Sequence, residues 1–250
     1  PLSSTTASKI AFFITCIWWF VFSLPMIRQV KQVHYIEREP QMIKKSFQRL
    51  WKTMKRVKDY KYVTLFLFAY FFYIDGVGTI ISMSTAYGMD VGLNSGVLLL
   101  VLLMTQIVAA PFSVLYGRLA NRYSAKSMLF VGIFIYIIVC IYGFFLETAL
   151  DFWILAMLVA SSQGGIQALS RSYFAKLIPK NHANEFFGFY NIFGKFASIT
   201  GPFLMGITAQ LTGRSNMGIL SLIFLFITGA IVLYFVPSDK ENLGSTKPLA

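Results

Sequence analysis

Polar side chains recur at helical spacing inside long apolar segments of the sequence, where a polar group is costly unless it is paired, hydrated or part of a site. This spacing selects the candidate solute- and ion-binding residues Asp75, Thr79, Gln106, Gln163, Gln167, Arg171, Asn191 and Lys195. A charged group at membrane depth suits the transfer of a proton or an ion. Amides and hydroxyls suit recognition of a small polar solute, or simply contacts between helices.

Asp75 is the strongest candidate because it lies deep in its segment. It comes twelve residues after Val63, where the segment begins. This places it about 18 Å from that end at ~1.5 Å per residue, near the middle of a hydrocarbon core about 30 Å thick. The short side chain must be protonated, paired or hydrated there. We expect a coupling or substrate-binding carboxylate with Lys195 as its charge partner. The alternative is a packing aspartate that bonds backbone near Gly76 and Gly78.

A second polar face lies on the segment 152–177. Gln163, Gln167 and Arg171 follow one another at intervals of four residues, so they share one side of a helix. Two amides that face a cavity could hold the carboxylate and the amine of a zwitterion. Arg171 lies near one end of its segment, where an arginine can equally serve as an anchor at the inner membrane surface.

Patterns for metal or covalent chemistry are missing from the sequence. Cys16 and Cys140 lie inside apolar runs, and neither His34 nor His182 has a cysteine or histidine at ligand spacing. The sequence also lacks paired intramembrane carboxylates, the zinc-protease and nucleophile-elbow motifs, and a phosphate-binding glycine-rich loop. We therefore expect no metal, no cofactor and no enzymatic activity, and we expect a gradient as the energy source of any transport.

The composition places these residues in a membrane. Hydrophobic residues make up 56% of the chain and charged residues 13%, against about 25% charged in soluble domains. This balance excludes an ordinary soluble enzyme domain, a disordered tail and a disulfide-rich secreted scaffold. The formal net charge of +12 indicates no nucleic-acid partner in so apolar a chain. In a membrane protein, basic residues gather on cytoplasmic loops.

Seven apolar runs are long enough to cross a bilayer as helices, which needs roughly 20 residues each. They are residues 10–26, 63–83, 97–116, 127–146, 152–177, 186–211 and 219–236. Lipid offers no partner to a free backbone N–H or C=O, so each span must be an α-helix. Nineteen lysines and arginines fall on one side and two on the other. This predicts an all-α membrane protein with an external N-terminus and a cytoplasmic C-terminus.

The spans differ in polarity in a repeating order. After the first span the sequence runs polar, polar, apolar and again polar, polar, apolar. Two successive units of three helices have opposite orientations, which is the 3+3 inverted repeat found within one half of some transporters. We expect the second, third, fifth and sixth spans to surround a polar surface, and the fourth and seventh to face lipid. Pro111 and the pair Gly201–Pro202 predict kinks.

The third span ends in the sequence GRLANRYSAK, residues 117–126. It resembles the cytoplasmic loop signature of the major facilitator superfamily. The resemblance implies a cytoplasmic gate made by Gly117, Arg118, Asn121, Arg122 and Lys126, with the glycine in a tight turn and the basic side chains paired with helix C-termini or acidic groups. Asn121 stands where the family often has aspartate and cannot form a charged bridge. The alternative is a basic loop that only sets topology.

Three other stretches are more specific: YIDGVGT at 73–79, QGGIQALSRSYFAKLIP at 163–179 and EFFGFYNIFGKFASITGP at 185–202. With them the chain resembles, over essentially its whole length, the vacuolar amino-acid effluxer-like branch of the superfamily, named for a yeast autophagy-related permease. The resemblance implies export or exchange of a small solute, with amino acids as the substrates. It also implies a bacterial plasma membrane, or a vacuolar membrane in a eukaryote.

The resemblance divides the chain as well. Residues 1–27 correspond to the sixth helix of a twelve-helix transporter, 28–61 to a cytoplasmic linker, 62–237 to the six-helix C-terminal half and 238–250 to a cytoplasmic tail. The N-terminal six-helix half is then the partner that this chain lacks.

The linker has a pattern of its own. Apolar residues from Ile43 to Val57 recur at helical spacing while basic residues fill the other faces, and Pro40 stands just before them. A basic amphipathic helix of this kind fits the anionic inner leaflet of a bilayer. A calmodulin-target-like helix and a solvated linker with incidental periodicity are the alternatives.

Seven spans with an external N-terminus also fit a heptahelical receptor or sensor. A retinal protein needs a lysine at membrane depth, usually in its last helix, whereas Lys195 lies in the sixth span. That class also leaves the repeat of three helices unexplained. The main prediction is therefore half of a secondary transporter that moves a small solute by alternating access.

Overall fold

The computed structural model describes residues 4–30, 48, 51, 59–90, 92–179 and 183–238. The chain divides into two units, Pro1–Ser46 and Phe47–Ala250. Every regular element of the described residues is an α-helix, and seven helical stretches among them are long and apolar enough to cross a membrane. The predicted fold class is therefore confirmed. The amphipathic helix predicted in the linker lies almost entirely outside the described residues.

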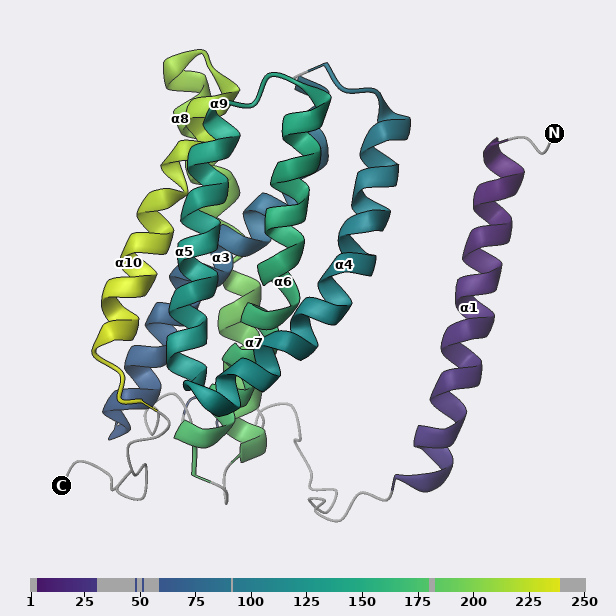
Figure 1. Cartoon of the computed structure of the whole chain (residues 1–250). Helices are drawn as coiled ribbons and strands as arrows, with labels where there is room; N and C mark the ends of the chain where they lie inside the picture. The colour runs from purple at the N-terminus through teal and green to yellow at the C-terminus, as the bar shows by residue number, and fades with distance from the viewer. Residues whose placement is uncertain are drawn as a thin grey trace. The chain divides into compact units, whose positions relative to one another are not determined.

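The first unit contains helix α1, Ser4–Gln29, drawn in purple in Figure 1. It extends the predicted first span at both ends. Its apolar side chains are distributed around the whole helix rather than on one stripe, which is typical of a span that has no wet face. Thr15 donates its hydroxyl to the backbone carbonyl of Ala11 at 2.8 Å, so this polar group is satisfied within the helix.

The second unit is a bundle. Its helices are α3 (Lys61–Asp90), α4 (Ser95–Arg122), α5 (Ala125–Phe144), α6 (Ala149–Leu177), α7 (Ala183–Phe196), α8 (Thr200–Thr212), α9 (Ser215–Ser221) and α10 (Ile223–Tyr234). The α4–α5 and α6–α7 connections and the end of α10 lie at the same end of the bundle (Figure 1). The basic connections within this unit therefore share one end, as a positive-inside arrangement requires.

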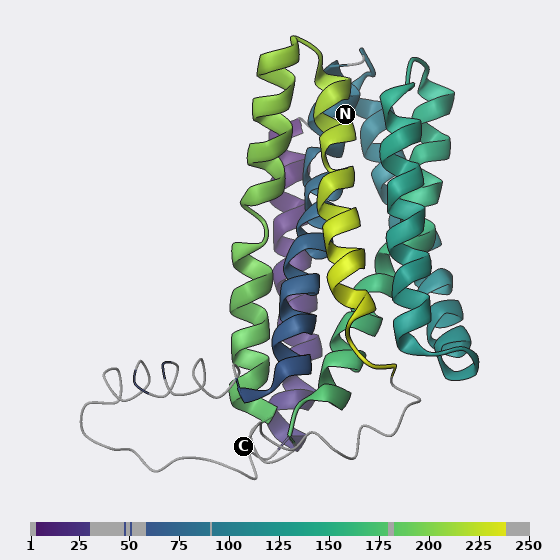
Figure 2. The ribbon, with the colours of Figure 1, turned by 90° about the vertical axis from the view of Figure 1, so that its left-hand side faces the viewer.

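Two of the crossings are interrupted. The sixth span consists of α7 and α8, which Figure 2 shows as two successive segments, and the seventh consists of α9 and α10. The kink predicted at Gly201–Pro202 occurs as this break at residues 197–199. A proline lacks the N–H for the helical ladder and its ring clashes with the carbonyl four residues earlier. By contrast, α4 continues through Pro111 and curves (Figure 1).

Helix α3 is the central element, because it contacts α6, α7, α8 and α10. Helix α6 packs against both α4 and α5. Small residues allow the close approach of α4 and α6: a Cβ atom on Gly164 would lie 2.9 Å from the Cβ of Ser113. Predicted site residues lie on α3, α4, α6 and α7 within this bundle.

Candidate functional site

A cavity of about 530 Å³ lies between α3, α6 and α7. It is lined by Tyr70, Ile74, Val77, Gly78, Gly164, Gln167, Ala168, Arg171, Tyr190, Asn191, Gly194 and Ser198. Its volume is in the range of small-molecule sites, about 300–1,000 Å³. Helices α5 and α10 do not line it.

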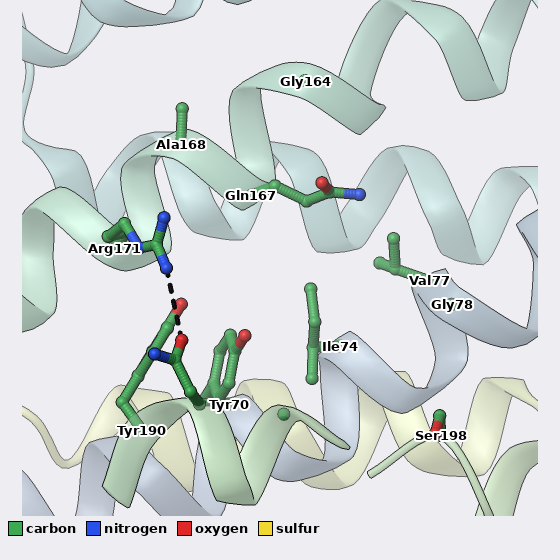
Figure 3. A pocket seen from close by; sticks show the side chains of 12 residues that line it. Tyr70, Ile74, Val77, Gly78, Gly164, Gln167, Ala168, Arg171, Tyr190 and Ser198 are labelled. Carbon is green, nitrogen blue, oxygen red and sulfur yellow. Dashed lines mark hydrogen bonds between the residues drawn. The ribbon is translucent and has the colours of Figure 1, made fainter. Parts of the chain in front are cut away.

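The polar side of the cavity belongs to α6 and α7. Figure 3 shows Gln167 and Arg171 extending from α6 toward the side chains of α3 and α7. Nη2 of Arg171 donates a hydrogen bond to Oδ1 of Asn191 at 3.2 Å. Three of the predicted residues, from two spans, are therefore brought together at one cavity.

The aromatic side of the cavity was missed by the sequence reasoning. The rings of Tyr70 and Tyr190 are stacked, with centroids 4.2 Å apart, and Phe174 stacks on Tyr190 at 4.8 Å. A Cβ atom on Gly194 would lie 3.0 Å from the hydroxyl of Tyr70, so glycine leaves room for that ring at the cavity wall. Tyr70, Ile74 and Val77 follow helical spacing on one face of α3, and this spacing is the signal in the sequence that could have indicated the wall.

Gln106 and Gln163 lie elsewhere. They border a separate small cavity of about 40 Å³ between α3, α4 and α6. A space of this size holds a few water molecules at most. The four polar spans therefore do not surround one common surface: the third span, α4, lines this small cavity and not the large one.

Asp75 and Thr79 face the start of α8, and neither lines the large cavity. Both are 1% exposed. Thr79 donates its hydroxyl to the backbone carbonyl of Asp75 at 2.7 Å. A Cβ atom on Gly201 would lie 2.8 Å from Oδ1 of Asp75, and it would overlap Oγ1 of Thr79. Glycine at this position is therefore what lets α8 approach α3.

The carboxylate of Asp75 sits among donors without bonding to them. The backbone N–H of Gly201 and the hydroxyl of Thr200 lie near it, yet neither carboxylate oxygen has a hydrogen-bond partner among the described residues. The N-terminal end of a helix carries a partial positive charge, which favours an anion at this place. The alternative of a packing aspartate that bonds backbone near Gly76 and Gly78 is therefore not seen, because neither carboxylate oxygen bonds to a described residue.

Lys195 is exposed on α7 and lines neither cavity. Within the part of the chain that the structure describes, no ion pair joins it to Asp75. On this span Asn191, Gly194 and Ser198 line the large cavity, and Lys195 does not. The pairing of Asp75 with Lys195 is not formed in this structure.

The predicted gate loop is shorter than expected. Helix α4 continues to Arg122, so Gly117 lies inside a helix with no heavy atom within 4 Å of an added Cβ. The tight turn predicted at Gly117 is wrong. The chain turns at residues 123–124, where the side chain of Ser124 accepts the N–H of Ser127 at 3.0 Å and so caps α5.

The basic residues of this loop differ in their roles. Nζ of Lys126 donates to the backbone carbonyl of Tyr234 at 2.8 Å and also to that of Val236, and so caps the C-terminal end of α10. The guanidinium of Arg122 lies 5.6 Å from the ring centroid of Tyr123. Arg118 and Asn121 are exposed. The pairing of a basic side chain with a helix C-terminus is therefore seen for Lys126.

Comparisons with known proteins bear on what this arrangement does. A family model described as "Vacuole effluxer Atg22 like" matches residues 2–243. The MFS-type transporter YxiO of Bacillus subtilis (strain 168) is 63% identical over 242 residues, which cover 97% of this chain and 56% of that relative.

More distant relatives are fungal. Autophagy-related protein 22 of Cryptococcus neoformans (strain JEC21) is 25% identical over 260 residues, covering 95% of this chain and 45% of the relative. The protein of the same name from Pichia angusta is 25% identical over 271 residues, with coverage of 94% and 48%. The chain thus spans about half the length of the curated relatives it matches, and none of these names is that of an enzyme.

Proposed function

The chain belongs to the family of vacuole effluxers like Atg22, within the major facilitator transporters, and we propose that the full-length protein moves a small solute across a membrane by alternating access. The observation that carries this proposal is the cavity of about 530 Å³ between membrane-spanning helices, with Gln167, Arg171 and Asn191 on its wall. Polar side chains from facing helices are costly in lipid and are retained where they meet a solute. The chain supplies one wall, and the half that it lacks supplies the other.

Amino acids are the proposed substrates. The cavity combines amides and a guanidinium on α6 and α7 with two tyrosine rings and an aliphatic strip on α3 and α7. Such a mixture suits a molecule with a polar head and a compact body. A heptahelical receptor is less well supported, because the relatives are named as transporters and the sixth and seventh spans are interrupted.

Asp75 is the proposed coupling residue. Its carboxylate lies beside the start of α8, where an ionised form is attracted by the positive end of the helix and a protonated form is not. Gly194 and Ser198, on the same span as α8, line the cavity. Gain or loss of a proton at Asp75 can therefore alter the contact between α3 and α8 and shift one wall of the cavity. Lys195 is proposed to approach this carboxylate in another state of the cycle.

The orientation and location are proposed from the charge distribution. The basic connections lie at one end of the bundle (Figure 1), and we assign this end and the chain's C-terminus to the cytoplasm and its N-terminus to the outside. The basic linker is proposed to rest on the anionic inner leaflet. The relative from Bacillus subtilis supports a bacterial plasma membrane.

Reconstitution of the full-length protein tests this function. Purified protein in liposomes is given a panel of radiolabelled amino acids, with and without an imposed proton or sodium gradient. We expect gradient-dependent movement of at least one of them above that of protein-free liposomes. Absence of movement for every member, in both directions and under both gradients, would reject amino-acid transport.

A further inference from the structure

The large cavity holds a single charge. Among the described residues that line it, Arg171 is the only one with a charged side chain at neutral pH. No aspartate or glutamate is among them. The guanidinium gives one hydrogen bond, to Oδ1 of Asn191 at 3.2 Å. It forms no ion pair with an acid in the described ranges of the chain. A guanidinium has five N–H donors, so several of them remain available for hydrogen bonds to a ligand.

Although Arg171 is exposed, its side chain is directed toward a neighbouring helix. Figure 3 shows the side chain of Arg171 pointing toward Tyr190, across the cavity from its own helix. The hydrogen bond to Asn191 fixes one nitrogen of the guanidinium group. A planar guanidinium that is fixed on one side presents the geometry that a carboxylate binds with two parallel hydrogen bonds.

On the premise that this cavity is the proposed solute site, we propose that Arg171 binds the carboxylate of the solute, and that the site selects solutes with a carboxylate and no net positive charge. A guanidinium attracts an anionic group and repels a second cation. Among the described residues that line the cavity, none is an acid that could offset this repulsion.

The rest of the cavity fits the rest of such a solute. The stacked rings of Tyr70 and Tyr190 and the side chains of Ile74 and Val77 offer apolar contact to a solute's body. The amide of Gln167 lies one helical turn from Arg171 and can accept a hydrogen bond from an α-amine. Neutral and acidic amino acids fit this arrangement, whereas lysine would bring its ammonium group to a wall without a partner.

Paired ligands test the inference. The full-length protein in liposomes transports its best amino-acid tracer while norleucine or lysine competes, because these two differ by the terminal ammonium group. Leucine and leucinol form a second pair, because leucinol lacks the carboxylate. We expect lysine and leucinol to compete at least about tenfold more weakly than their partners, the scale of one charge-assisted hydrogen bond. Inorganic phosphate is added as a competitor to separate carboxylate from phosphate recognition.

Variants assign the effect to Arg171. For Arg171→Gln we expect apparent affinity for leucine to fall about 10- to 100-fold and the difference between leucine and leucinol to disappear. Arg214→Gln is the matched control, since Arg214 is exposed between α8 and α9 and lines neither cavity. Ligand-induced thermal stabilisation of the purified protein reads out binding if a variant no longer transports. Gln167→Glu adds an acid to the cavity and is expected to improve competition by lysine.

The outcomes separate this inference from the function on which it rests. If the wild-type protein moves no amino acid, the proposed function fails. If it moves amino acids but lysine and leucinol compete as well as norleucine and leucine, or Arg171→Gln keeps the wild-type order, the role of Arg171 is overturned and the function stands. Competition by phosphate without competition by leucine would also overturn the choice of a carboxylate.

Discussion

Helix α3 presents two different faces to its neighbours. Toward α6 and α7 it offers Tyr70, Ile74 and Val77, which form the apolar wall of a cavity of about 530 Å³. Toward α8 it offers Asp75 and Thr79, both 1% exposed. The more polar face of the helix is thus the one in tight contact with protein, and the more apolar face is the one that borders open space.

These two faces show how a polar stripe within a membrane should be interpreted. Water is absent from the hydrocarbon core, so a buried carboxylate needs neighbours such as the free N–H groups at the start of a helix. The break before α8 supplies them beside Asp75. A cavity for an amphipathic solute, by contrast, needs apolar surface from one helix and polar groups from the others. A polar stripe therefore shows that one face of a helix contacts polar groups. It does not show whether those groups belong to a neighbouring helix or to a solute.

Asp75→Asn gives the largest expected effect. The amide keeps the shape of the side chain and removes its ability to change charge, so gradient-driven uptake should fall by at least about tenfold while exchange of labelled for unlabelled solute is retained. Both rates are measured in the same preparation of proteoliposomes. Uptake that keeps the wild-type dependence on external pH would remove Asp75 from the coupling step.

Gly201→Ala tests the contact on the polar face of α3. The new Cβ would meet Oδ1 of Asp75 at 2.8 Å and overlap Oγ1 of Thr79, and we expect a loss of about 1–3 kcal/mol of stability. The control is Gly206→Ala in the same helix, where an added Cβ has no atom within 4 Å. Thermal unfolding of the full-length protein compares them. Equal melting temperatures would mean that α8 does not approach α3 as described.

Gln163→Leu is expected to have the smallest effect. Gln163 borders the cavity of about 40 Å³, which is too small for an amino acid. KM and kcat of transport should therefore stay within about twofold of the wild-type values. A rise in KM comparable to that of a variant in the large cavity would show that the solute reaches the space between α3, α4 and α6.

The sequence was sufficient for the parts of the structure that one helix determines alone. The number of spans follows from the length of apolar runs. The break before Pro202 agrees with the missing N–H and the ring clash of proline, although α4 continues through Pro111. The family follows from stretches such as residues 163–179 and 185–202, and the match over residues 2–243 confirms it.

The sequence was insufficient where neighbours decide. Helical spacing put Gln163 with Gln167, but α4 covers the first and leaves the second facing the large cavity. Lys195 was also a predicted site residue, but its neighbour Gly194 lines the cavity instead. The rotation of a helix against its neighbours depends on close approaches such as that of Gly164 to Ser113, which a single sequence does not reveal.

Tyr70 and Tyr190 could not be assigned to the cavity from the sequence for a different reason. Tyrosine is common in buried cores as well as at binding surfaces, so its presence on an apolar stripe indicates neither. Their stacking across two helices makes them a wall of the cavity. At Gly117 the opposite happened. The family signature predicted a tight turn at this glycine, but Gly117 lies inside α4 and the chain does not turn there.

The central claim is that the cavity between α3, α6 and α7 is the solute site, and Gln167 tests it most directly. The measurement is the KM of amino-acid transport by the full-length protein in liposomes for Gln167→Leu and for Gln210→Leu, a matched substitution at an exposed glutamine of α8 that lines neither cavity. Loss of one hydrogen bond predicts a KM about fivefold or more above wild type for the first variant, and no change for the second. Equal KM values for both variants and the wild-type protein would contradict the claim.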